Sequence, residues 1–194
     1  MRNISAMRHL LCLLYFLFPV LPAVADGDSA LEYSVAEIRQ AIGEWDVVTE
    51  FLREDGSVAR SIDGHYSFSW IVEDKLAAGR NSMPELGTSS GILFYVNESA
   101  RTIEMVSVGP DGRLWVMTGP LGGDTRYSQV YDDSNGNSGQ LRFTRYNVTE
   151  DGFESSMEYT DDGGASWKPG NHQVFRRAKT PPEGAQDPAQ TDAL

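Results

Sequence analysis

Five Asp-Gly pairs along the chain each lie between two short runs rich in β-branched and aromatic residues. Asp and Gly tolerate the positive φ angles of tight hairpin turns, so each pair predicts two antiparallel strands joined by a turn. The pairs are Asp55-Gly56, Asp63-Gly64, Asp111-Gly112, Asp151-Gly152 and Asp162-Gly163. A succession of hairpins of this kind restricts the fold to an antiparallel, all-β architecture.

The runs between the turns predict about ten strands, within the usual error of boundary assignments. A long meander exposes two sheet edges unless it closes, so we expect an up-and-down barrel of about 8–10 strands rather than a sandwich. The predicted strands are residues 44–53, 58–62, 65–72, 76–83, 91–96, 102–108, 113–118, 126–131, 140–148, 153–160 and 173–177.

One short helix is expected before the first strand. Residues 34–42 place Val35, Ile38 and Ile42 on one helical face, which is the period of an amphipathic helix. Ser34 suits the N-cap, and Gly43 suits the end of the helix.

The first 25 residues are typical of a secretory signal peptide. Arg2 and Arg8 precede an apolar run over residues 10–20, and the small residues Ala23-Val24-Ala25 follow, so we expect cleavage after Ala25. Cys12 lies within this segment, with most of the apolar run after it, which does not fit a lipoprotein cleavage site. The mature chain would then contain no cysteine and no membrane span, and would reach the periplasm or the exterior held together by its core alone.

The exported part is strongly acidic. Loss of residues 1–25 changes the formal net charge from −12 to −14, and a field of that sign repels nucleic acid and anionic lipid. We therefore expect no nucleic-acid partner. The predicted organisation is a flexible segment at residues 26–33, one barrel domain at 34–177 and a disordered, Pro-rich tail at 178–194.

Several motifs resemble those of a bacterial family of uncharacterised, secreted lipocalin-like (calycin) proteins. "IGEWDV" at residues 42–47 is similar to the Gly-x-Trp motif with which these barrels open, and "VFRR" at residues 174–177 is similar to their closing strand. Residues 91–119 and 139–167, between these two motifs, also resemble segments of the family. The four segments follow one another along the chain in the same order as in the family. The resemblance implies an antiparallel up-and-down lipocalin-like barrel, with one short N-terminal helix and with the Trp of the motif at the closed end. It implies no established activity.

Residues 160–167, "TDDGGASW", resemble the Asp-box of sialidases. A sialidase propeller needs several blades and usually repeats the motif, whereas this chain has one copy and is too short. Even in those enzymes the motif is a turn: the Asp accepts backbone N–H groups and the Trp packs over the hairpin. We interpret residues 160–167 as structural.

Catalytic and metal-binding constellations are sparse. After the signal peptide the chain has His65 and His172 as its only histidines, too few to suggest a nucleophilic triad or clustered metal ligands. No Gly-x-Ser-x-Gly elbow is present. The sequence leaves enzymatic activity open but favours a protein without catalytic residues and without a metal site.

The barrel interior is the remaining candidate site, because alternate residues of each strand point into it. We predict a pocket for a small apolar or amphipathic ligand, with an arginine at its mouth for a polar or anionic group. For residues 140–148 the alternation leaves open which face points inward. The predicted lining residues are Tyr66, Trp70, Trp115 and Met117, and the candidates for the mouth are Arg80 and Arg142.

The sequence also allows two alternative functions. Some calycin barrels, nitrobindin among them, bind haem through one histidine of a late strand, and His172 precedes the closing run. Otherwise the domain is an interaction module that meets a basic partner through its acidic surface or through the tail at residues 178–194. The module alternative predicts a barrel interior filled by side chains.

Overall fold

The computed structural model describes residues 26–132 and 138–179. The predicted signal peptide, residues 1–25, lies outside the described residues. So does the predicted tail from residue 180 onward. Both remain predictions.

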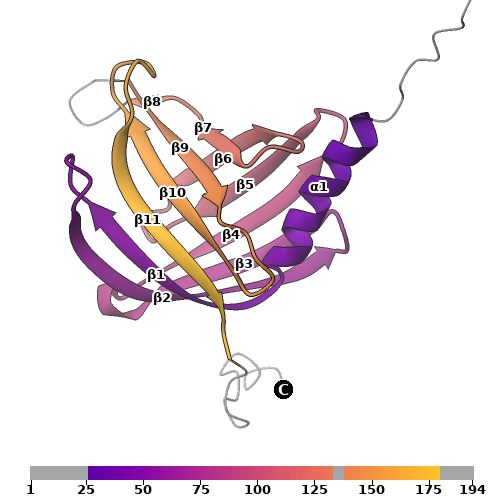
Figure 1. Cartoon of the computed structure of the whole chain (residues 1–194), viewed down its shortest axis with the longest axis horizontal. Coiled ribbons are helices and arrows are strands. Elements are labelled where there is room, and N and C mark those ends of the chain that lie inside the picture. The colour runs from indigo at the N-terminus through magenta and orange to yellow at the C-terminus, as the bar shows by residue number, and fades with distance from the viewer. Residues whose placement is uncertain (1–25, 133–137, 180–194) are drawn as a thin grey trace, which may run out of the picture.

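Ten antiparallel strands form a closed barrel (Figure 1). The strands follow chain order from β1 to β7, β9 and β10 come next, and β11 pairs with β1 to complete the ring. This confirms the predicted up-and-down barrel. The strands are β1 (Gly43–Leu52), β2 (Val58–Val72), β3 (Leu76–Met83), β4 (Thr88–Asn97), β5 (Thr102–Val108), β6 (Leu114–Pro120), β7 (Thr125–Ser128), β9 (Ser138–Tyr146), β10 (Gly152–Thr160) and β11 (Lys168–Arg177). The short β8 (Tyr131–Asp132) pairs with β9, and the 3₁₀ helix η1 (Pro84–Leu86) joins β3 to β4.

Four of these five Asp-Gly pairs lie at hairpin turns as predicted. Asp151-Gly152 lies at the turn between β9 and β10, where the backbone N–H of Thr149 donates to the carbonyl of Gly152 at 2.8 Å. Gly56, Gly112 and Gly163 have φ angles of 80°, 72° and 73°, which lie in the region that glycine favours. Asp63-Gly64 is different, because β2 continues through it and Gly64 pairs with Val47 of β1. The predicted strands 58–62 and 65–72 are therefore one long strand that pairs with β1 and then with β3.

The helix is longer than predicted. α1 (Asp26–Ala41) includes residues 26–33, which were expected to be flexible, and Ser34 is not its N-cap. Ser34 lies buried within the helix, and its Oγ accepts a hydrogen bond of 2.9 Å from the backbone N–H of Gly122. No helix among the described residues has both the length and the apolar character needed to span a bilayer.

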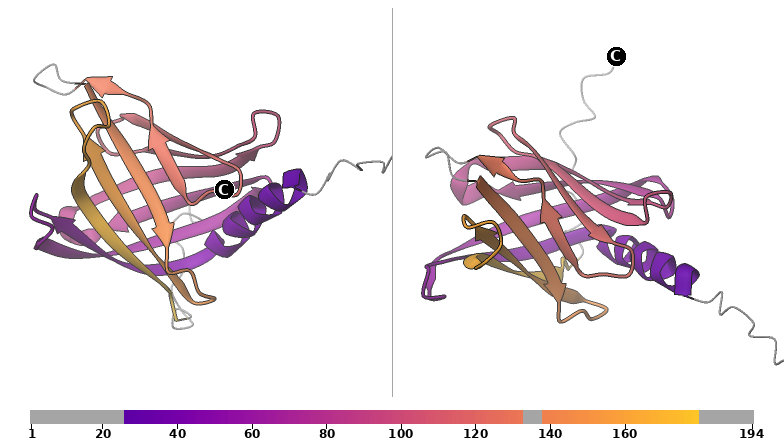
Figure 2. Two further views of the ribbon diagram at one scale, coloured as in Figure 1. Left: turned by 45° about the horizontal axis from the view of Figure 1, so that its top comes forward. Right: turned by 90° about the horizontal axis from the view of Figure 1, so that it is seen from above.

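α1 packs at one end of the barrel (Figure 2). Val35, Ile38 and Ala41 turn toward the barrel, and the side chain of Ile38 is completely buried. The first strand begins directly after the helix, so this end contains the starts of β1, β3 and β5. The buried residues that complete this cluster are Ala77, Phe94, Val96, Ile103 and Leu121.

The Gly-x-Trp segment joins the helix to the first strand. Trp45 is 1% exposed, and its indole N–H donates a 2.8 Å hydrogen bond to the carbonyl of Ala41. The guanidinium of Arg177, from the closing strand, lies 4.0 Å from the Trp45 ring and donates to the carbonyl of Gln40 at 2.7 Å. Gly43 has a φ of 111°, and a Cβ there would lie 2.9 Å from the Arg177 side chain. These contacts tie the first and last strands to the end of α1.

Candidate functional site

The barrel encloses a cavity of about 260 Å³. Alternate residues of a strand point to opposite faces of the sheet, and the residues that point inward from most of the strands build the wall. Much of this wall is aromatic or aliphatic, with sulfur-containing side chains between the rings. Its apolar members include Phe68, Ile92, Met105, Phe143, Phe153 and Met157.

A group of polar side chains interrupts the apolar wall. The Tyr66 hydroxyl accepts hydrogen bonds of 3.1 Å from Asn81 and 3.1 Å from Gln173. Gln173 also donates to the hydroxyl of Thr49 at 3.0 Å. All four side chains line the cavity, so the interior is amphipathic.

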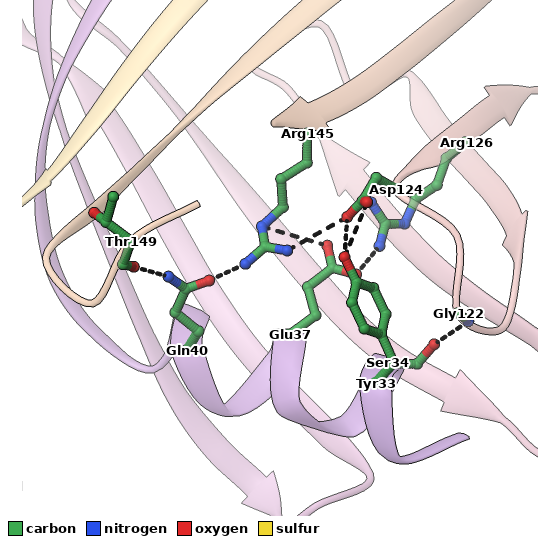
Figure 3. A network of polar contacts seen from close by, with 9 residues as sticks. All are labelled: Tyr33, Ser34, Glu37, Gln40, Gly122, Asp124, Arg126, Arg145 and Thr149. Carbon is green, nitrogen blue, oxygen red and sulfur yellow. Dashed lines mark hydrogen bonds and ion pairs between the residues drawn. The ribbon is translucent and has the colours of Figure 1, made fainter. Parts of the chain in front are cut away.

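Charged side chains gather at the α1 end of the cavity (Figure 3). Arg126 of β7 is 1% exposed, and its Nη2 donates to Glu37 of α1 at 2.6 Å. Arg145 of β9 lies 3.9 Å from the same carboxylate and donates to the side-chain oxygen of Gln40. Asp124 approaches Arg145 to 3.5 Å from the more exposed side. Two buried guanidinium groups therefore share one buried carboxylate.

The same region fastens the helix to the loops of the barrel. The Tyr33 hydroxyl lies 2.9 Å from both carboxylate oxygens of Asp124, and Gln40 donates to the carbonyl of Thr149 at 2.5 Å (Figure 3). Burial and the neighbouring Asp124 carboxylate raise the pKa of Tyr33 above its usual value. α1 therefore crosses this end of the barrel, from the apolar cluster beneath it to β9 and the loop that follows β9.

Two residues of the cavity wall each carry a buried polar atom without a hydrogen-bond partner among the described residues: Nε of Arg126 and Oδ1 of Asn171. Asn171 pairs with Phe51 at the end of β1, so it lies toward the barrel end away from α1. A buried polar group without a partner costs about 1–3 kcal/mol, so both atoms favour a molecule that would bind them.

The structure places the four predicted lining residues in four different settings. Tyr66 lines the cavity, whereas Trp70 packs against the cluster beneath α1. Met117 is buried in β6 but does not belong to the cavity wall. Trp115 packs edge-on against Tyr131, with the ring centres 5.1 Å apart.

The two arginines predicted at the mouth lie outside the barrel. Asn81 and Phe143 line the cavity, so their neighbours Arg80 and Arg142 point to the outer face. There Arg142 pairs with Glu158 at 2.8 Å. Among the described residues, the charged side chains that line the cavity are instead Arg126, Arg145 and Glu37, which were not predicted. A glutamate on the apolar face of the helix was the available signal, because a buried carboxylate needs a partner.

His172 also lies on the outer face. Asn171 and Gln173 line the cavity, so His172 between them points away from it. Its two ring nitrogens lie 3.0 Å from Glu50 and 2.8 Å from Glu154. The position of His172 therefore gives no support to haem bound inside the barrel.

We expect the wild-type protein to lose stability as the pH rises from about 5.5 to about 8.5, and His172→Gln to lose less. Partial burial acts to lower the pKa of His172, but the hydrogen bonds to Glu50 and Glu154 outweigh it and raise the pKa. Protonated His172 therefore stabilises the fold fully at pH values below its pKa in the unfolded chain, about 6.5. This stabilisation is lost as the pH rises through the pKa in the folded protein. His172 and both glutamates are partly exposed, so the effect on the free energy of unfolding should not exceed about 1 kcal/mol. Urea unfolding at both pH values measures it; an equal change in both proteins contradicts the prediction.

Residues 160–167 form a turn with the geometry expected from the sequence. Asp162 accepts hydrogen bonds from the Ser166 hydroxyl at 2.5 Å, from the Ser166 backbone N–H at 3.0 Å and from Thr160 at 2.7 Å. The bonds from Ser166, with that from Thr160, hold the pKa of Asp162 well below its usual range. Trp167 packs over the hairpin, 4.3 Å below the guanidinium of Arg142. These contacts are structural.

In residues 26–132 and 138–179, no cluster of three or more His, Cys, Asp or Glu side chains has an arrangement that could hold a metal ion.

No protein-family model and no curated protein matches the chain. A crystal structure of Rv2717c from M. tuberculosis superimposes with a TM-score of 0.49 at 12% sequence identity, covering 75% of this chain and 98% of that one. A similarity of this size says nothing about a ligand. The resemblance to the lipocalin-like family stays a prediction beyond the barrel fold itself.

Proposed function

We propose that the protein is exported and that its barrel binds a small amphipathic molecule without converting it. The observation that carries the proposal is the cavity of about 260 Å³, whose largely apolar wall includes Arg126 and Asn171, two residues that each have a buried polar atom without a partner among the described residues. A ligand with an apolar body and a polar group would supply both kinds of contact at once. Ordered water could satisfy the polar atoms but would gain nothing from the apolar wall.

The size of the cavity supports a small ligand. Its volume is close to the lower end of the range of roughly 300–1,000 Å³ in which small-molecule pockets fall. The alternative of an interaction module predicted an interior filled by side chains, and the cavity counts against that alternative.

The first test is native mass spectrometry of the protein purified from the envelope of its own host, followed by denaturing extraction of anything bound. A reproducible additional mass would support the proposal and identify the ligand. A protein that carries no additional mass and also binds none of a panel of small amphipathic molecules would contradict it.

We expect Ser107→Trp to weaken binding by roughly tenfold or more, because the new ring would occupy space in the cavity. Ser107 lines the cavity near the end of β5, away from α1. Ser69→Trp is the matched control, since Ser69 is exposed on the outer face of β2 and should leave binding unchanged. Titration with a fluorescent amphipathic probe measures both variants. Equal affinities in the two would show that the probe binds elsewhere.

A further inference from the structure

We propose that the ligand is an apolar monocarboxylate, whose carboxylate binds Arg126 at the α1 end of the cavity while its apolar chain lies along the aromatic wall. The inference rests on the proposed function, because it assigns a chemical class to the ligand of the same cavity. Three observations carry it: the position of the Arg126 guanidinium, the charge balance of the cavity and the apolar surface beside the charged groups.

The Arg126 guanidinium is fixed in place before any ligand arrives. Its Nη2 is bonded to Glu37 at 2.6 Å, and the rings of Phe94 and Phe143 lie 5.1 Å and 5.5 Å from its central carbon. Among the described residues nothing accepts a hydrogen bond from Nε, although the side chain is 1% exposed and lines the cavity. A donor that is immobilised in advance loses little entropy when a carboxylate oxygen accepts its proton.

The charge balance of the cavity selects the sign of the ligand. Within the described part of the chain, the charged side chains that line the cavity are Arg126, Arg145 and Glu37, two cations and one anion. Asp124 compensates Arg145 from outside, where its side chain is 38% exposed and is screened by water. Buried charges interact more strongly than charges in water, so this end favours an anion and disfavours a cation.

The surroundings of Arg126 select an amphipathic acid rather than a small inorganic anion. Phe94 and Phe143 flank the guanidinium, and the apolar wall continues from them through Met105 and Phe153. A chain attached to the carboxylate would bury apolar area at about 25 cal/mol per Å², which a free inorganic anion cannot do.

The test compares three molecules that share one tail: octanoate, octanol and octylamine. We expect isothermal titration of the protein, expressed as the full chain and purified, to give roughly tenfold tighter binding for octanoate than for octanol, with octylamine weakest. Equal or tighter binding of octanol, or of octylamine, would overturn the carboxylate inference and leave the proposed function standing. Binding of none of the three would contradict both.

A substitution then locates the head group. Arg126→Met should weaken the binding of octanoate by roughly tenfold and leave the affinity for octanol unchanged. The substitution removes the charged donor but keeps most of the volume of the side chain. Arg142→Met is the matched control, since Arg142 lies on the outer face and pairs with Glu158. An octanoate affinity unchanged in Arg126→Met, or lost equally in Arg142→Met, would overturn the assignment. The comparison of head groups needs no substitution and decides the inference even if Arg126→Met does not fold.

Discussion

Replacement of Glu37 by leucine is expected to lower the free energy of unfolding by about 3–5 kcal/mol, because it leaves the buried guanidinium of Arg126 without its carboxylate and Arg145 with Asp124 alone. The side chains of Glu37, Arg126 and Arg145 are 4%, 1% and 7% exposed, so bulk water does not solvate the charges in place of the lost partner. A folded domain of ordinary stability has about 5–15 kcal/mol in total, so the variant should be close to unfolding at room temperature. Urea denaturation followed by circular dichroism measures the loss.

Two further variants separate loss of charge pairing from loss of packing. Glu32→Leu changes a glutamate of the same helix whose side chain is 69% exposed and pairs with Arg39, so it should cost less than about 0.5 kcal/mol. The double substitution Glu37→Leu with Arg126→Leu removes both members of the closest pair and should recover part of the loss. Equal losses in Glu37→Leu and Glu32→Leu would show that the buried pair does not stabilise the fold.

The sequence predicts the strands well where the signals are local. β3 and β5 begin and end at the predicted residues, 76–83 and 102–108. Both strands are bounded by turns or a 3₁₀ helix, but only β5 is rich in β-branched residues. The closure of the ring could also be predicted, from a general property of sheets: an open meander would leave two unpaired edges.

The errors arise where tertiary packing overrides a local signal. Asp63-Gly64 has the composition of a turn, but both of its residues pair with β1 within a continuous strand. Ser34 has the composition of an N-cap, but the helix continues in front of it, because residues before Ser34 also find partners. Leu31 packs against the cluster beneath α1, and Tyr33 bonds to Asp124 on a distant loop. Neither of these tertiary contacts can be predicted from the helix propensity of the segment itself.

The site was predictable in type but not in its residues. Alternation along β2 is clear: Tyr66, which was predicted to line the interior, lies in the cavity wall together with Phe68 two positions further on. Alternation along β9 is ambiguous, because each face carries one arginine and one aromatic ring. The inward face is the one with Phe143 and Arg145, and Arg145 is accommodated there by Glu37, a residue more than a hundred positions away along the chain. A contact between residues so far apart in the sequence forms only in the folded protein, and the residues around Arg145 in the sequence do not indicate it.

Replacement of Trp45 by alanine is expected to destabilise the protein by about 3–5 kcal/mol, the range for deletion of a large aromatic side chain from a core. Trp45 is 1% exposed, and its ring meets those of Phe153 and Phe175 edge-on at 5.3 Å and 6.4 Å. The substitution also removes the surface on which Arg177 stacks at 4.0 Å. β1, β10, β11 and the end of α1 would lose a common contact, so we expect one cooperative transition at lower urea concentration.

Trp45→Phe and Trp115→Ala show which part of this loss belongs to the junction. Trp45→Phe keeps most of the ring but loses the hydrogen bond to the Ala41 carbonyl, and should cost about 1–3 kcal/mol. Trp115→Ala removes a partly buried ring in β6 and should cost less than Trp45→Ala, because a partly exposed site leaves a smaller cavity. If Trp45→Ala cost no more than Trp115→Ala, the junction of α1 with the first and last strands would not be a main source of stability. The barrel would then depend on its strand pairing and on the cluster beneath α1.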